Sequence, residues 1–275
     1  RSGDRVTIIH HPDVRRMLLT QKAIAEGGRA MIYAAAQTAD LMVDAGRRQD
    51  RATQDKHDDT LGFYTPILKG FLTEMGLEAA NLGMQVFGGH GYIHEHGMEQ
   101  IARDARIATL YEGTTGIQAL DLLGRKVLLG TRGKCVRDFS RIMLRSAKAH
   151  WLAHGSIGRM ARSTAKRAIE WNLLTLRIMR RVGKDRDLVG SASVDYLMYS
   201  GYVMMAHFWV RQAAVAQTFL RNGKGAESPE FYRANIQTAE FYFDRLLPRA
   251  DAHRKSALAP TRSLMQMGNG DFAFS

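Results

Sequence analysis

Long stretches in which apolar residues recur at the spacing of an α-helix, with almost no proline to interrupt them, constrain this chain more than any other feature. Only 5 of its 275 residues are proline, whereas 14 are methionine. Proline breaks the interior of a helix because it lacks an amide hydrogen and clashes with the preceding turn, so its scarcity permits long helices. The sequence therefore predicts an all-α fold rather than one with many short strands.

The first of these stretches runs from about residue 12 to residue 46. Pro12 suits the first turn of a helix, and Gly27 and Gly28 lower helix propensity inside it, which predicts a kink or a close crossing with another helix. The apolar residues that follow near helical spacing are Val14, Met17, Leu18, Ile24, Met31, Ala35 and Met42.

Residues 47–59 are polar and charged, which predicts a connecting segment before the second helix. That helix has Pro66 near its predicted start and stops at Gly88–Gly89. A loop over 90–97 and shorter helices over 98–110 and 114–129 are expected next. Four helices with one apolar face each predict a four-helix bundle over residues 1–130.

Residues 131–275 change in character and predict a second helical domain, with a boundary near residue 130. Its expected helices are 134–153, 156–182, 190–222 and 229–250, separated by glycine-rich and charged breaks. The final segment, SLMQMGNGDFAFS, has no clear pattern, and we expect it to be mobile or to dock on a partner.

The net charge of +12 is concentrated in the second domain, since residues 1–130 carry −1 and residues 131–275 carry +13. A basic half could attract nucleic acid, an anionic membrane or an acidic partner. The basic residues are dispersed along amphipathic helices rather than clustered, which favours side chains that are solvated or paired with a part of the protein outside this sequence. A nucleic-acid- or membrane-binding module remains the alternative function.

The single cysteine, Cys135, excludes a disulfide within the chain and fits a reducing, cytoplasmic compartment. The sequence contains no run of about 18 apolar residues, so no membrane span is expected. The first residues, RSGDRVTIIHH, show neither an initiator methionine nor a signal-peptide pattern. We therefore expect the chain to be part of a longer protein.

Three short segments between residues 85 and 118 could carry chemistry. In the first, QVFGGHGYIHE, Gly88, Gly89 and Gly91 would let a phosphate approach the backbone, or would form an ordinary helix stop. His90, His94 and His96 with Glu95 could suggest zinc, but their glycine-rich loop and the lack of a second ligand cluster argue against a metal. No dinucleotide or P-loop glycine motif occurs.

The other two segments are RDARI and LYEGTTGIQ. Arg103 and Asp104 could form a surface ion pair of little energetic value. Glu112 beside Tyr111 could be a catalytic carboxylate or simply an acid favoured by a helix N-terminus. Thr114 and Thr115 are plausible helix caps in either case.

Taken together and in this order, the three segments resemble the C-terminal helical domain of acyl-CoA dehydrogenases. The resemblance covers about residues 5–130 and is closest to the subgroup that acts on 3-methylthiopropanoyl-CoA, which has a helical extension similar to residues 131–275. The matching residues are Gln85, Gly88, Gly89, Gly91 and Tyr92, then Arg103 and Asp104, then Tyr111, Glu112, Gly113 and Thr114.

The resemblance implies an FAD-dependent oxidation of an acyl-CoA to the 2-enoyl-CoA, in which Glu112 removes the α-proton and a hydride passes to the flavin. It implies that Thr114 contacts FAD and that Gln85, Gly88 and Gly89 reach the FAD of a neighbouring subunit. Burial against Tyr111 would make Glu112 a better base. Gly116 departs from a family position that is often polar, so no side-chain contact with FAD is expected there.

The resemblance also implies partners: the acyl-CoA substrate, an electron-transfer flavoprotein or similar acceptor, and further copies of the chain in a homodimer or tetramer. The family's N-terminal helical and β-barrel regions are not in this sequence. We therefore expect the isolated chain to bind FAD weakly and to lack turnover. The extension is expected to shape chain-length selectivity or to support assembly.

Overall fold

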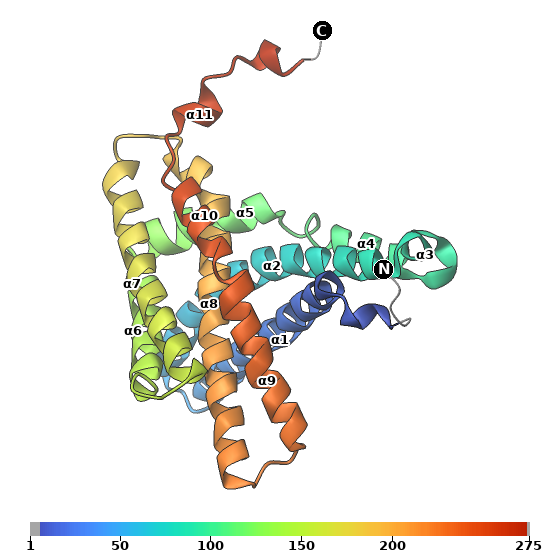
Figure 1. Ribbon diagram of the computed structural model, residues 1–275. Coiled ribbons are helices and arrows are strands. Elements are labelled where there is room, and N and C mark those ends of the chain that lie inside the picture. Colours follow the sequence, from blue (N-terminus) through green and yellow to red (C-terminus); the bar gives the residue numbers. More distant parts are fainter. Residues whose placement is uncertain (1–5, 274–275) are drawn as a thin grey trace.

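A computed structural model describes residues 6–273, and every regular element in that part of the chain is helical (Figure 1). The predicted all-α class is confirmed. Two long helices, α1 (Pro12–Arg47) and α2 (Arg51–Phe87), form an antiparallel hairpin. The expected first helix is thus correct to within one residue at its C-terminal end.

The expectation of a connecting segment over residues 47–59 is wrong, because α2 begins at Arg51. The carboxylate of Asp50 accepts a hydrogen bond from the Thr53 amide at 3.1 Å and caps the new helix, and these bonds lower the pKa of Asp50. Pro66 consequently lies in the interior of α2, where its ring is buried, and not near the helix start.

The glycine stop after α2 is confirmed, since Gly88 adopts φ +62° and ends the helix at Phe87. The expected loop over 90–97 is largely helical instead, with short turns α3 (Gly89–Tyr92) and η2 (His94–His96). Helix α4 (Met98–Ile107) follows. Helix α5 (Thr115–Leu120) continues into η3 (Asp121–Gly130), which is wound as a π-helix.

The second half forms α6 (Lys134–Ala149), α7 (Ser156–Val182) and α8 (Leu188–Asn222) close to their expected spans. The fourth expected span, 229–250, is divided into α9 (Pro229–Phe241), the π-helical η4 (Tyr242–Leu246) and α10 (Arg249–Ser256). Short helices α11 (Arg262–Met265) and η5 (Asn269–Phe272) form a tail that extends away from the body (Figure 1).

Helix α8 is the central element of the molecule. All ten residues from Gly201 to Val210 are buried, and α8 packs against α1, α2, α5, α7, α9 and α10. A helix that is apolar on every side must be enclosed by others, which is how α8 lies in Figure 1. One continuous core therefore joins the first half of the chain to the second, and the division near residue 130 stays a prediction about domains.

Two glycines allow helices to approach α8 closely. A Cβ at Gly27 of α1 would lie 2.6 Å from Nε1 of Trp209, and a Cβ at Gly201 would lie 2.1 Å from Cγ of Phe71 in α2. Of the two outcomes expected for Gly27–Gly28, the close crossing is the one observed, and α1 continues through it.

Ion pairs join α10 to two other helices, α7 and α2. The Arg167 guanidinium donates to both carboxylate oxygens of Asp251, at 2.6 and 2.7 Å, and lowers the pKa of that carboxyl group. Arg249 on α10 donates to both oxygens of Glu78 on α2, at 2.9 and 2.8 Å. Some of the basic side chains in this half are therefore engaged in ion pairs.

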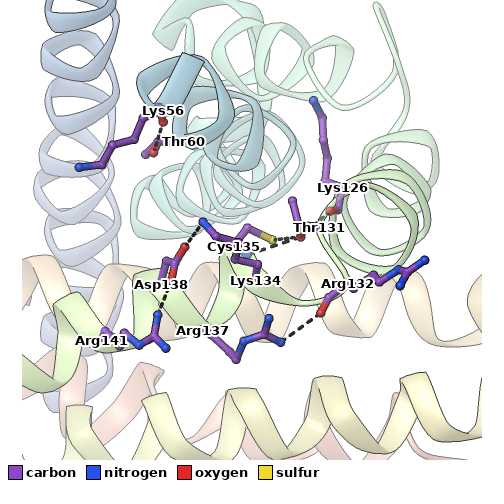
Figure 2. Close-up of polar contacts among 10 residues, drawn as sticks. All are labelled: Lys56, Thr60, Lys126, Thr131, Arg132, Lys134, Cys135, Arg137, Asp138 and Arg141. Carbon is purple, nitrogen blue, oxygen red and sulfur yellow. Dashed lines mark hydrogen bonds and ion pairs between the residues drawn. The ribbon is translucent and has the colours of Figure 1, made fainter. Parts of the chain in front are cut away.

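Figure 2 shows the junction between η3 and α6, where Cys135 lies. The Thr131 hydroxyl bonds the Lys126 carbonyl at 2.9 Å and lies 3.1 Å from the Cys135 Sγ. Burial raises the pKa of this thiol, so Cys135 is a packing residue with little thiolate at neutral pH. Beside it, Asp138 accepts from Lys134 and Arg141, each at 2.7 Å.

None of the helices among residues 6–273 combines the length and the apolar character that crossing a membrane requires.

Candidate active site

The turn between α4 and α5 contains the segment in which Glu112 was predicted to act. Glu112 has φ +49° and Gly113 has φ +96°, so two successive residues adopt a left-handed conformation. Non-glycine residues rarely do so, because Cβ crowds the backbone, and such residues concentrate at functional sites. Glu112 is exposed at this turn.

Helix α2 contacts this turn through the side chain of Lys69. Lys69 donates from Nζ to the Ala108 carbonyl at 2.6 Å, and its ammonium group lies 5.4 Å from the centroid of the Tyr111 ring. Both contacts fix the chain just before Glu112. Lys69 lies about forty residues away in sequence and belongs to no motif, so the sequence alone does not indicate it.

A second contact from α2 fixes the chain just after Glu112. The Thr115 hydroxyl donates to Glu74 Oε1 at 2.5 Å, while Thr114 caps α5 by accepting from the Ile117 amide at 3.4 Å. The predicted capping role is thus confirmed for Thr114, whereas Thr115 is the first residue of α5. No sequence motif indicates Glu74 either.

The expected burial of Glu112 against Tyr111 is not found among the described residues. Glu112 is exposed and Tyr111 is 54% exposed, and the contact recorded for the Tyr111 ring is with the Lys69 ammonium group. Several apolar side chains around the turn are likewise left uncovered by residues 6–273. They are Ile107, Leu110, Ile117 and Leu120.

The glycine segment follows α2 at the far end of the same helix. Gly88 adopts φ +62° and Gly91 is packed, since a Cβ there would lie 2.4 Å from the Met84 carbonyl oxygen. Gly89 differs from both, because its φ is not positive and a Cβ would meet nothing within 4 Å. Neither conformation nor packing within the described chain explains glycine at position 89.

A groove of about 720 Å³ lies between α2, the start of α5 and α8. Its lining includes residues from both the glycine segment and the segment that contains Glu112. Gln85 and Thr115 both line it, and so do Glu74 and Glu78. Its apolar lining comes from Val194 and Met198 of α8 and from Met75, Leu77 and Leu82 of α2. The structure therefore places Gln85 and the residue after Thr114 on one groove, whereas Glu112 does not line it.

The histidines and Asp104 make contacts with residues close to them in sequence. His94 bonds Glu99 at 3.2 Å, and the rings of His90 and His96 lie 5.3 Å apart. Among residues 6–273 no three metal-ligating side chains gather in one place. Asp104 accepts a hydrogen bond from Gln100 at 2.7 Å, one turn earlier on α4.

Comparison with known proteins covers both halves of the chain. Residues 1–128 match the family described as acyl-CoA dehydrogenase, C-terminal domain, and residues 137–268 match acetyl-CoA dehydrogenase C-terminal like. The chain is 36% identical to a 3-methylmercaptopropionyl-CoA dehydrogenase of Ruegeria pomeroyi over 90% of its length and 41% of that protein. It is 30% identical to a broad-specificity linear acyl-CoA dehydrogenase of Mycobacterium tuberculosis, over 99% of this chain and 45% of that one.

The fold is similar to that of a solved acyl-CoA dehydrogenase. The structure of an acyl-CoA dehydrogenase from Bacillus anthracis, complexed with FAD, superposes with a TM-score of 0.70 at 16% identity, over 98% of this chain and 45% of that one. The chain therefore spans less than half the length of the relatives that it matches.

Proposed function

The chain belongs to the acyl-CoA dehydrogenase family, and on that premise we propose that it forms the C-terminal part of an FAD-dependent enzyme that oxidises an acyl-CoA to the 2-enoyl-CoA. In this proposal Glu112 removes the α-proton of the thioester. The observation that carries it is the Glu112 turn: a carboxylate on a left-handed backbone, held on both sides by α2.

The surroundings of Glu112 support a role that needs more protein than residues 6–273 supply. Exposed apolar side chains flank the carboxylate, and surfaces of this kind are typical of faces that bind a ligand or another protein surface. Cover over this face would desolvate Glu112, raise its proton affinity and bring it to the reacting carbon. The rest of the enzyme, the cofactor and the acyl chain are the proposed cover.

The chemistry divides between the chain and the cofactor. Glu112 would take the proton from Cα, and a bound FAD would supply the acceptor for the hydride from Cβ. The negative charge that develops on the thioester oxygen needs a donor, and the Glu112 backbone amide belongs to the same turn. Lys69 and Glu74 act on the base only by holding that turn.

FAD is proposed from the family, and the local structure fits it. Gly89 leaves its backbone open to an approaching group, and Gly88 beside it also has no atom within 4 Å of a Cβ. Gln85 offers an exposed amide on the preceding turn of α2. The Thr114 hydroxyl accepts from Ile117 and keeps its own hydrogen free to donate.

The acyl substrate proposed is 3-methylthiopropanoyl-CoA, since the relative from Ruegeria pomeroyi carries that activity in its name. A homodimer or tetramer is proposed because residues 85–89 would serve the FAD of a neighbouring subunit. The proposed electron acceptor is an electron-transfer flavoprotein or a similar carrier.

The test is an assay of the protein expressed from its natural gene. We expect it to purify with FAD, to elute as an oligomer, and to reduce an artificial electron acceptor when 3-methylthiopropanoyl-CoA is added. Butanoyl-CoA and octanoyl-CoA serve as comparison substrates. An enzyme free of flavin, or one inactive toward all three thioesters, would overturn the proposal.

A further inference from the structure

Two adjoining cavities lie between α1, α6, α8 and α9, and share no lining residue with the groove described above. The larger, of about 600 Å³, opens between α1, α8 and α9. The smaller, of about 320 Å³, lies between α6 and α8. Arg211 and Val215, one helical turn apart on α8, line both cavities and form the ridge between them.

The larger cavity is walled by aromatic rings from three helices. Tyr33 comes from α1, Phe208 from α8 and Phe231 from α9. Tyr33 and Phe231 are more than half exposed at its mouth. Rings presented in this way offer flat faces on which a planar ligand can stack.

Amide side chains add hydrogen-bonding capacity to the same cavity. Gln212 and Asn235 line it, and the atoms Gln212 Nε2 and Asn235 Oδ1 are shielded from solvent and find no hydrogen-bond partner among residues 6–273. Shielded polar atoms normally find a partner. Because the terminal torsions of glutamine and asparagine turn readily, these groups can present a donor and an acceptor to a ligand in the cavity.

The smaller cavity is suited to an anion. Arg211, His150, Ser146 and Thr218 line it, and the described residues place no aspartate or glutamate on either cavity. The Arg211 guanidinium lies 5.9 Å from the centroid of the Phe208 ring, so it joins the aromatic and the cationic parts.

From this arrangement we propose a second ligand site, which binds a nucleoside phosphate with its base among the aromatic rings and its phosphate at Arg211 and His150. An aliphatic acyl chain would leave the amides of Gln212 and Asn235 unpaired, whereas the edge of a base supplies both donors and acceptors. Both cavities are of the size that small-molecule ligands occupy.

The experiment is calorimetric titration of the purified protein with adenosine 5′-monophosphate, and separately with adenosine, inorganic phosphate and decanoate. We expect the monophosphate to bind most tightly. Arg211→Gln should weaken its binding about tenfold or more, because a charge-assisted contact is lost. Arg177→Gln, which removes the same charge from an exposed position on α7, should leave the affinity unchanged.

Adenine compounds could also bind at the proposed FAD contacts around Gln85, and Gln85→Ala separates the two sites. Binding that survives Gln85→Ala and is weakened by Arg211→Gln supports the new site, whether or not the enzyme oxidises acyl-CoA. Binding that is weakened only by Gln85→Ala overturns it. Equal affinity for inorganic phosphate, or tighter binding of decanoate, would also overturn it, as would no binding of the monophosphate.

Discussion

Gly201 on α8 lies directly against Phe71 on α2, so that a Cβ at position 201 would come within 2.1 Å of the Phe71 Cγ. The two residues are 130 positions apart in sequence and belong to different halves of the chain. Phe71 is fully buried, and its ring packs edge-on against Tyr202 with centroids 4.9 Å apart. The contact sets the distance at which α8 crosses the first helical hairpin.

Replacing Gly201 with alanine should therefore destabilise the protein by about 1–3 kcal/mol or more, because neither the Phe71 ring nor the helix backbone has room to move. Gly76 is the matched control, since it also lies inside a helix but a Cβ there would meet nothing within 4 Å. Gly76→Ala should be neutral or stabilising by up to about 1 kcal/mol. Thermal unfolding of both variants measures the difference, and equal melting temperatures would contradict the close crossing.

His207, which is buried on α8, should make the free energy of unfolding depend on pH. Burial, aided by the charge of Arg211, lowers the pKa of His207 to about 4, and its Nδ1 has no hydrogen-bond partner in the described part of the chain. The unfolded chain binds a proton at this residue below about pH 6.5. Stability is therefore lost as the pH falls from about 6.5 towards 4, by an amount on the order of 3 kcal/mol.

His207→Phe keeps an aromatic ring against Phe139 and removes the titrating group. Chemical denaturation between pH 4.5 and 7.5 should show a shallower pH dependence for this variant than for the unmodified protein. Parallel curves would mean that His207 does not titrate differently in the folded and unfolded states.

Lys69 should act as a positioning residue for the Glu112 turn. Lys69→Met keeps the length of the side chain but removes the bond to the Ala108 carbonyl and the charge near the Tyr111 ring. We expect kcat to fall about tenfold, with the KM for acyl-CoA changed less than about threefold, because a small displacement of a catalytic group is costly. Lys56→Met, at an exposed position on α2, is the control and should leave kcat unchanged.

Gly89 should affect cofactor binding and not folding. Gly89→Ala places a Cβ in open space on a residue whose φ is not positive, so the melting temperature of the FAD-free protein should stay within a degree or two. FAD affinity should fall about tenfold if the backbone there is approached by the cofactor. Fluorescence titration with FAD measures this, and an unchanged Kd would remove the residue from the proposed site.

Much of the fold follows from local patterns in the sequence. The helix Ser156–Val182 matches its expected span, and Pro12 and Gly88 mark real helix ends. The sequence does not indicate the start of α2, because residues 51–60 are mostly polar and show no apolar stripe. The helix forms there because Asp50 caps it and because α2 packs against α1. Polar composition alone does not distinguish an exposed helix from a loop.

The residues of the candidate site that belong to sequence motifs could be predicted. The residues that contact them from distant parts of the chain could not. Glu112, Gln85 and Thr114 belong to recognisable segments, whereas Lys69 and Glu74 act through contacts about forty residues apart. The exposure of Glu112 among residues 6–273 could not be predicted for a related reason. Local sequence indicates which residue is an acid but not which surface covers it.

The most direct test of the proposed mechanism is Glu112→Gln, which keeps the size of the side chain and removes the base. Anaerobic mixing of the FAD-loaded enzyme with 3-methylthiopropanoyl-CoA, followed by flavin absorbance, measures the reductive step alone. We predict flavin reduction slower by about 10²–10⁴-fold, with acyl-CoA affinity retained. Reduction at a rate close to that of the unmodified enzyme would contradict the account and place the base elsewhere.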